Sequence, residues 1–490
     1  MRVPSVAVSA VLLAAGAGAA PAPWVEVKSG HFTVITNAGE KEGRRTAWQF
    51  EQIRAGLAQL WPWAKAEAGP PFYVFAVRDE ATLRTLGPQY WEGKRFRPAS
   101  FWAGNRDRTY VALRTDIPQP DDVGDNPYQQ AYWGYVAATF HRSFPRQLPE
   151  WYARGICGVM SNTVVREKEL HVGRLMKQNV RIMRERAPIP LKDFLAADRR
   201  SPWVTQQGRI DLFDAQAWAL VHYLMFGEEG RNGPKMNRFN RLLHDGVAED
   251  AAIKEAFGDL TPYYEGTRIY VTRPVFPFAR VPVSLDLRSE AFAARTLSPG
   301  ESAVVRGDLL VTMGRPVEAR AFAAEAAKAD PSVPGPWEIE AALLDGEGKK
   351  DEAKAAYAKA VEAGSKNAHV HYRLAQLEWV PRPDAAQRDQ LVARLQAARE
   401  LDPANAFTLS FLAEALSSQG KHQEAAELAV QAVKNDPSET YHRMALARIL
   451  WNAHEVEQAV KVAQSALQTA DTDEEKKEVR GFLDFAAKAH

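Results

Sequence analysis

Three things are scarce in this 490-residue sequence, and each scarcity narrows the kind of protein it can be. A single cysteine, Cys157, excludes an internal disulfide framework. The formal net charge of +1 gives no overall electrostatic case for a nucleic-acid or acidic-membrane partner. Beyond the N-terminus, no segment approaches the roughly 18 uninterrupted apolar residues of a membrane-spanning helix. The composition, 46% hydrophobic and 25% charged, is that of a folded globular protein, and the length predicts two or three domains.

Residues 1–19 are typical of a cleavable secretory signal. Arg2 supplies the basic start, "VPSVAVSAVLLAA" the apolar stretch and "AGAGAAP" the small-residue cleavage region. We place the cut after Ala17 or Ala19. Because the apolar run is short and rich in Ala and Gly, it is a poor membrane anchor. We therefore expect a periplasmic or secreted protein with no stable membrane insertion after cleavage.

Residues 24–290 mix strand and helix signals. Strands are expected near Val25–Val27 and Phe32–Thr36, and the segments "PFYVFAV" and "SFWAGNRDRTYVAL" predict a third strand and a hairpin around Asn105. Between them, "KEGRRTAWQFEQIRAGLAQLWPW" has apolar residues at helical spacing. More helices follow, so this half is predicted to be α+β.

Residues 300–490 carry an internal repeat. Ala319 and Ala353 lie 34 positions apart, as do Pro403 and Pro437. A period of this length with small residues at the helix contacts resembles the tetratricopeptide repeat, a stacked helix-turn-helix unit. Five repeat units are predicted across 300–472: 300–333, 334–367, 368–405, 406–439 and 440–472. A C-terminal capping helix is predicted at 473–490.

The resemblance also implies a working surface. In this family the first helix of each unit faces a concave groove, which binds proteins or peptides. Counting from the in-phase alanines, we expect six partner-binding residues there: Tyr372, Trp379, Phe407, Tyr441, Arg448 and Trp451. The alternative is that these aromatic side chains pack between neighbouring repeats or against the first half.

Three stretches of the first half resemble a second family. "WVEVKSGHFTVITN…QFEQIRAGL", "LPEWYARGICGVMSNT" and "LFDAQAWALVHYLMFG" are similar to exported bacterial peptidase-MA-like domains of the zincin, gluzincin type, which are frequently fused to tetratricopeptide repeats. The resemblance implies an α+β zincin-like N-terminal domain at 24–290, followed by an all-α tetratricopeptide-repeat solenoid.

The chemistry of that family is missing from this sequence. A zinc peptidase needs two histidines one helical turn apart, a glutamate beside the first and a third ligand on a following helix. By position, the two histidines fall on Trp133 and Ala137, the glutamate on Gly134 and the third ligand on Arg154. None of these residues can take the role of the residue it replaces. Arg154 would place a permanent cation where zinc should lie. We therefore predict a degenerate site with no catalytic residues, no metal and no cofactor.

The leading hypothesis is a non-catalytic exported pseudopeptidase whose repeats bind another protein, as a scaffold or adaptor in the cell envelope. The alternative is a hydrolase with a relocated or atypical site, built on His141 and Glu150 as migrated ligands or on Cys157 as a nucleophile. A third possibility is a purely structural scaffold. The remaining histidines of interest, interpreted as core or surface residues, are His31, His171 and His222.

Two further stretches carry expectations. The proline-rich "TRPVFPFARVPVSLDLRSEAF" and the helix-start signal "LSPGES" predict a boundary near 280–300 between two separately stable halves. The basic stretch at 165–186 also contains Glu167, Glu169 and Glu185, which favours a solvated surface over a nucleic-acid site.

Overall fold

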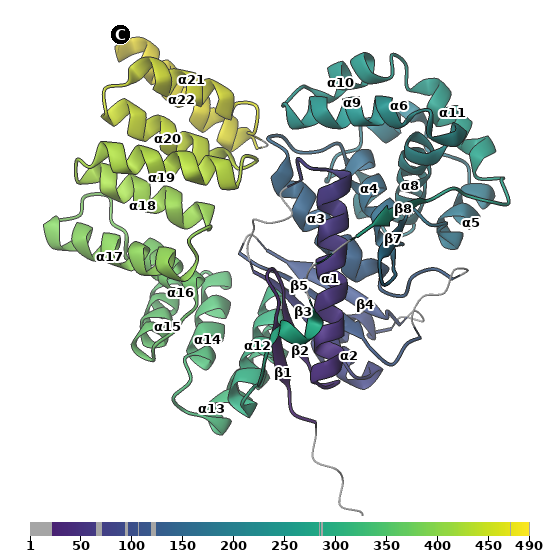
Figure 1. The fold of residues 1–490 in the computed structure, drawn as a ribbon. Helices are drawn as coiled ribbons and strands as arrows, with labels where there is room; N and C mark the ends of the chain where they lie inside the picture. Colours follow the sequence, from purple (N-terminus) through teal and green to yellow (C-terminus); the bar gives the residue numbers. More distant parts are fainter. Residues whose placement is uncertain are drawn as a thin grey trace, which may run out of the picture.

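The computed structural model places a mixed α/β body beside a curved stack of helices (Figure 1). The predicted signal, residues 1–19, lies outside the residues that the structure describes. Within the described part, no helix is both long and apolar enough to span a membrane. The described residues are 22–64, 71–93, 97–105, 107–118, 124–283, 285, 288–470 and 472–489.

A six-stranded mixed sheet organises the first half, with the order β4-β5-β3-β2-β1-β9. Strands β2, β3 and β5 run parallel, and the other neighbours are antiparallel. The expected strands and the hairpin around Asn105 are all present. The bounds are Val25–Lys28 for β1, Thr33–Thr36 for β2, Phe72–Val77 for β3, Ser100–Gly104 for β4, Thr109–Arg114 for β5 and Ala293–Thr296 for β9.

The outermost strand, β9, was not predicted from the sequence. It pairs antiparallel with β1, so the sheet includes residues beyond 290, the predicted end of the first domain. The preceding turn is fixed by Arg44, which donates hydrogen bonds to the carbonyl oxygens of Ser289 at 3.1 Å and Glu290 at 2.8 Å.

Alternate residues of the central strands face two different apolar layers, because successive side chains of a strand point to opposite faces. On one face, Val74 belongs to the main core with the aromatic rings of α1 (Glu40–Leu60) and α3 (Gln129–Ser143). There the ring centroids of Phe50 and Phe72 lie 6.0 Å apart, and those of Phe32 and Tyr135 lie 5.3 Å apart. This layer places α3 against the sheet.

Helices and a small sheet complete the first half. Strands Val164–Val165 (β6), Glu169–Val172 (β7) and Ala279–Pro282 (β8) form a separate three-stranded sheet. Three short 3-10 turns occur at Pro88–Tyr90, Glu228–Gly230 and Ser289–Ala291. The other helices are α2 Glu80–Leu86, α4 Glu150–Ser161, α5 Lys177–Glu185, α6 Leu191–Leu195, α7 Pro202–Thr205, α8 Ile210–Phe226, α9 Gly233–His244, α10 Glu249–Ala256 and α11 Thr261–Tyr270.

The second half is a stack of helix pairs, one pair in each predicted repeat unit, followed by α22. Gly314, Gly348 and Gly420 have φ of 68°, 76° and 81° in the turns inside their pairs, a backbone that favours glycine. The in-phase alanines are fully buried where paired helices meet. The bounds are α12 Pro299–Thr312, α13 Pro316–Ala329, α14 Gly335–Gly346, α15 Lys350–Glu362, α16 Ala368–Glu378, α17 Ala385–Leu401, α18 Ala406–Ser418, α19 His422–Asn435, α20 Thr440–Asn452, α21 Val456–Ala466 and α22 Asp473–Ala489.

The two halves share an apolar layer on the second face of the sheet. Phe75 and Tyr110 pack in one buried cluster with Leu297 and with Leu309 of the first repeat helix. Beside it, the carboxylate of Asp308 accepts hydrogen bonds from the Tyr110 hydroxyl and from Arg108 of the β4–β5 turn. The first repeat is therefore seated directly on the sheet.

Candidate functional site

The four positions that the resemblance assigns to a zinc site lie on α3 and α4, which pack against each other. Gly134 has no room for a side chain, because a Cβ there would lie 2.6 Å from the Trp102 side chain of β4. Trp133 and Ala137 are partly buried and pack against the apolar core. The space beside Gly134 is therefore filled by Trp102 from the neighbouring strand.

Arg154 is held by two carboxylates. Its Nε donates to Glu150 at 3.0 Å, and a terminal nitrogen donates to Asp214 of α8 at 2.8 Å. Burial raises the pKa of Asp214, and the adjacent guanidinium opposes that rise. In the part of the chain that the structure describes, no group of three His, Cys, Asp or Glu side chains is arranged to hold a metal ion. Glu150, one of the proposed migrated ligands, is thus the ion-pair partner of Arg154.

Cys157 is unsuited to nucleophilic chemistry. Its side chain is buried in α4, and this burial raises the pKa of the thiol well above its ordinary value. A reactive cysteine needs the opposite shift, because the thiolate is the nucleophile. Cys157 is therefore a small buried residue of the core around α4.

The other histidines have structural partners. The ring nitrogens of His222 lie 2.8 Å from the Tyr270 hydroxyl and 2.6 Å from the Gly173 carbonyl oxygen, and burial lowers the pKa of His222 to about 4. His171 Nε2 lies 2.7 Å from a carboxylate oxygen of Glu169, and His31 Nδ1 lies 2.9 Å from a carboxylate oxygen of Glu51. These contacts account for the positions of all three histidines, and no bound metal or substrate is needed to explain them.

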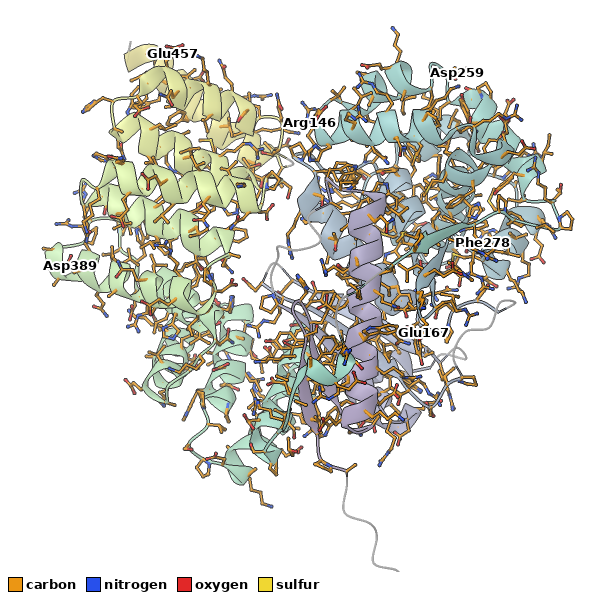
Figure 2. The ribbon with its side chains drawn as sticks, in the orientation of Figure 1. Arg146, Glu167, Asp259, Phe278, Asp389 and Glu457 are labelled. Atoms are coloured by element: carbon orange, nitrogen blue, oxygen red, sulfur yellow. The ribbon has the colours of Figure 1, made fainter. Side chains whose placement is uncertain are left out.

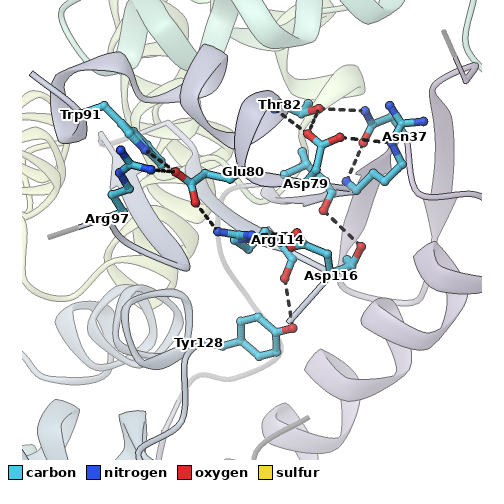
Figure 3. A network of polar contacts seen from close by, with 12 residues as sticks. Asn37, Asp79, Glu80, Thr82, Trp91, Arg97, Arg114, Asp116 and Tyr128 are labelled. Atoms are coloured by element: carbon cyan, nitrogen blue, oxygen red, sulfur yellow. Dashed lines mark hydrogen bonds and ion pairs between the residues drawn. The ribbon is translucent and has the colours of Figure 1, made fainter. Parts of the chain in front are cut away.

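A polar network at the carboxyl ends of the parallel strands is also fully paired (Figure 3). Arg114, the last residue of β5, binds Glu80 at 2.6 Å and Asp116 at 2.7 Å. The Tyr128 hydroxyl donates to the carbonyl oxygen of Arg114 at 3.1 Å. Since Tyr128 is the residue before α3, the network positions the start of that helix.

A hollow with a volume of about 1140 Å³ follows the concave side of the repeats. Four of the predicted residues line it: Tyr372, Trp379, Phe407 and Tyr441. The rings of Phe407 and Tyr441 stack with centroids 6.1 Å apart and planes 10° apart. Trp379 remains 51% exposed, whereas Tyr372 is buried. We call this hollow the repeat groove.

The other two predicted residues, Arg448 and Trp451, are not among the residues that line this hollow. Arg448 donates to Glu414 at 2.6 Å and to Glu478 of α22 at 2.9 Å. Trp451 packs against two rings of α22, with centroids 6.0 Å from Phe482 and 5.2 Å from Phe485. For Trp451, the alternative of packing against a neighbouring helix is the observed one.

Sequence reasoning missed other residues of the repeat groove. Phe411 lines it, one helical turn beyond Phe407. Ser410, the residue before Phe411, is fully buried, and its hydroxyl oxygen lies 2.8 Å from His442 Nδ1. A helical wheel centred on Phe407 would have found Phe411, because residues four apart share a face. Arg373 also lines the groove and binds Asp345 at 2.8 Å.

One end of the repeat groove is occupied by the first half. Asn105 and Asp107, in the β4–β5 turn, line the hollow. An oxygen of Asp107 lies 3.1 Å from the His369 ring, and Arg108 donates to Asn367 at 3.0 Å. Burial would raise the pKa of Asp107, but its contact with His369 lowers it overall. The groove is therefore bounded by both halves of the chain.

Comparison with known proteins adds a family for part of the second half. Among solved structures, similar folds include YrrB, "a TPR protein with an unusual peptide-binding site", with 18% identity, a TM-score of 0.30, and coverage of 37% of this chain and 91% of that chain. PilF of Pseudomonas aeruginosa has 17% identity, a TM-score of 0.30, and coverage of 38% and 88%. MamA of Desulfovibrio magneticus RS-1 has 17% identity, a TM-score of 0.28, and coverage of 35% and 96%.

No curated protein matches this chain. The family model that does match is the tetratricopeptide repeat, over residues 412–474. That stretch runs from within α18 to the start of α22, so it includes all of α19, α20 and α21. Residues 412–474 thus match the tetratricopeptide repeat, which suggests a protein-interaction module.

Proposed function

We propose that this protein is a non-catalytic, exported scaffold that binds a peptide segment of another protein in its repeat groove. The observation that carries the proposal is the aromatic wall of that groove, in which Trp379 remains 51% exposed. An exposed tryptophan beside other rings is costly in water, and Trp and Tyr are the usual anchors of protein contacts.

The charges of the groove favour an apolar peptide over a charged one. Arg373 is paired with Asp345, and Glu414 accepts from Tyr441 at 2.8 Å and from Arg448. Because these groups already bind one another, the groove offers mainly ring faces to a ligand. We infer that the bound segment inserts an aromatic or aliphatic side chain beside Trp379.

The first half, in this proposal, is a platform of peptidase-MA-like ancestry without peptidase chemistry. Support comes from Arg154, which is committed to two carboxylates, and from Gly134, where Trp102 leaves no room for a glutamate. The raised pKa of the Cys157 thiol disfavours the hydrolase alternative that depends on that residue. Export rests on the signal-like sequence at 1–19.

Binding to an array of peptides with and without aromatic residues tests the proposal. Trp379→Ala should weaken capture of aromatic peptides by about 2 kcal/mol, roughly thirtyfold, without lowering the melting temperature. Trp337→Ala is the matched control, because Trp337 is 40% exposed in the repeats and does not line the groove. Equal binding by the Trp379 variant and the wild type would overturn the groove assignment.

The same peptides report on catalysis. Mass spectrometry after incubation should find them intact, and the purified protein should contain no stoichiometric zinc. Cleavage that disappears on treatment with a chelator would replace the scaffold proposal with the relocated-metal hydrolase.

A further inference from the structure

A second surface, far from the repeat groove, combines exposed apolar side chains with unpaired cations. Its apolar members are Ile269, Val275 and Phe278, which are 72%, 75% and 38% exposed. They belong to the end of α11 and the loop leading to β8. Figure 2 shows Phe278 at the outer edge of the first half, on the side away from the repeats. We call residues 269–278 the apolar loop.

The apolar loop is held in its exposed position by contacts on both sides. Phe276 is buried beneath it, with its ring centroid 5.1 Å from that of Tyr270 and 6.2 Å from that of Trp218. Arg184 of α5 donates to the carbonyl oxygen of Val271 at 2.7 Å. Because Phe276 points inward, its neighbour Val275 is directed into solvent and cannot fold back onto the core.

Cations outnumber acidic residues around this loop. From Gly266 to Leu285 the sequence contains no aspartate or glutamate, and Glu265 lies one helical turn before Ile269. Glu185 is the single acid of α5 and also lines the hollow beside the loop. Among the described residues, none of the surrounding cations forms an ion pair, and all are exposed: Lys177, Arg181, Arg184, Arg273 and Arg280.

Four of these cations border one hollow. Lys177, Arg181, Arg184 and Arg273 line a depression of about 420 Å³ beside the apolar loop. Arg181 donates to the side-chain oxygen of Gln178 at 2.7 Å, and the guanidinium carbon of Arg273 lies 5.3 Å from the Tyr270 ring centroid. An anionic group entering the hollow would therefore meet several donors that have no carboxylate partner.

We propose that the apolar loop and its cations dock the protein on an anionic phospholipid surface. Val275, Ile269 and Phe278 would enter the headgroup layer while the arginines bind lipid phosphates, which is how interfacial proteins combine burial with charge. Nucleic acid would use the cations but would leave the protruding aliphatic side chains in water. The proposal is independent of the groove, because the two surfaces share no residue.

Co-sedimentation of the full chain with vesicles tests this surface. We expect binding to phosphatidylcholine vesicles that contain phosphatidylglycerol, weakened by added salt, and no binding to phosphatidylcholine alone. The double variants Val275→Ser with Phe278→Ser, and Arg181→Ala with Arg273→Ala, should each bind at least tenfold more weakly. A Phe278→Trp variant should show a blue-shifted emission on vesicles, which reports insertion directly.

Matched controls lie in the repeats. Val317→Ser removes a side chain that is 77% exposed, and Lys328→Ala with Lys354→Ala removes two exposed cations. Both should bind vesicles as the wild type does, and all variants should keep the wild-type melting temperature. The proposal would be overturned by equal binding to neutral and anionic vesicles. It would also be overturned if the two double variants of the apolar loop and its cations bound vesicles as the wild type does. Binding to polyglutamate beads but not to anionic vesicles would assign the surface to an acidic protein instead.

Discussion

Leu309 offers the sharpest test of how the two halves depend on each other. It lies in the first repeat helix, is fully buried, and belongs to the apolar cluster formed with Phe75 and Tyr110 of the sheet. Truncating a buried leucine to alanine costs about 2–5 kcal/mol, from lost burial and from the cavity left behind. Since the cavity would open against β3, Leu309→Ala should destabilise the sheet as well as the repeat.

Hydrogen exchange, followed separately for each segment, measures this coupling. In Leu309→Ala, the amides of Phe72–Val77 should lose about 2 kcal/mol of protection or more. The control is Leu395→Ala, because Leu395 is equally buried but belongs to a separate repeat cluster. If β3 keeps its protection in the Leu309 variant, the halves are separately stable, as the proline-rich junction in the sequence predicts, and our reasoning from the shared cluster fails.

Three further predictions concern single positions. Gly134→Ala should destabilise the protein by about 1–3 kcal/mol in urea unfolding, because the new Cβ meets Trp102, whereas Gly346→Ala, with open space around it, should stabilise it slightly. Hydrogen bonds hold the pKa of Glu51 at about 2 against its ordinary 4.5, despite burial that would raise it. This lowered pKa contributes about 3 kcal/mol to the free energy of unfolding above pH 4.5, and the contribution is lost as the pH falls toward 2. Glu51→Gln should therefore flatten the acid-unfolding curve. Trp451→Ala should lower the melting temperature by loosening α22 without affecting peptide capture, the opposite of the Trp379 variant.

The helix pairs could be predicted because each repeat unit contains its own evidence. Small residues such as Ala319 and turn glycines such as Gly348 recur in phase, and local contacts decide where each helix begins and ends. Strand β9 could not be found in this way. Its four residues, "AART", show no alternation of apolar and polar side chains, and pairing with β1 is a contact between distant parts of the chain.

The candidate sites were predictable to different degrees for physical reasons. Tyr372 and Phe407 line the groove, on the helix face that their spacing predicts, and their role in binding a partner stays a prediction. The packing of Trp451 against α22 could not be predicted, since the sequence does not indicate which face of α22 would cover it. The apolar loop escaped notice because the net charge of +1 averages over the whole chain. Only the fold brings the cations of α5 beside Arg273.

The pairing of β1 with β9 has a consequence for the order in which the chain folds. As the nascent chain emerges, β1 appears first, but its outer edge has no partner until residue 296 has been made. An open edge of this kind is a template for strand addition from another chain. Contacts between such distant segments also form slowly, whereas each repeat can close on its neighbours at once. The half synthesised first is therefore completed late, and a ribosome-bound chain of about 290 residues should be the form most in need of a holding chaperone.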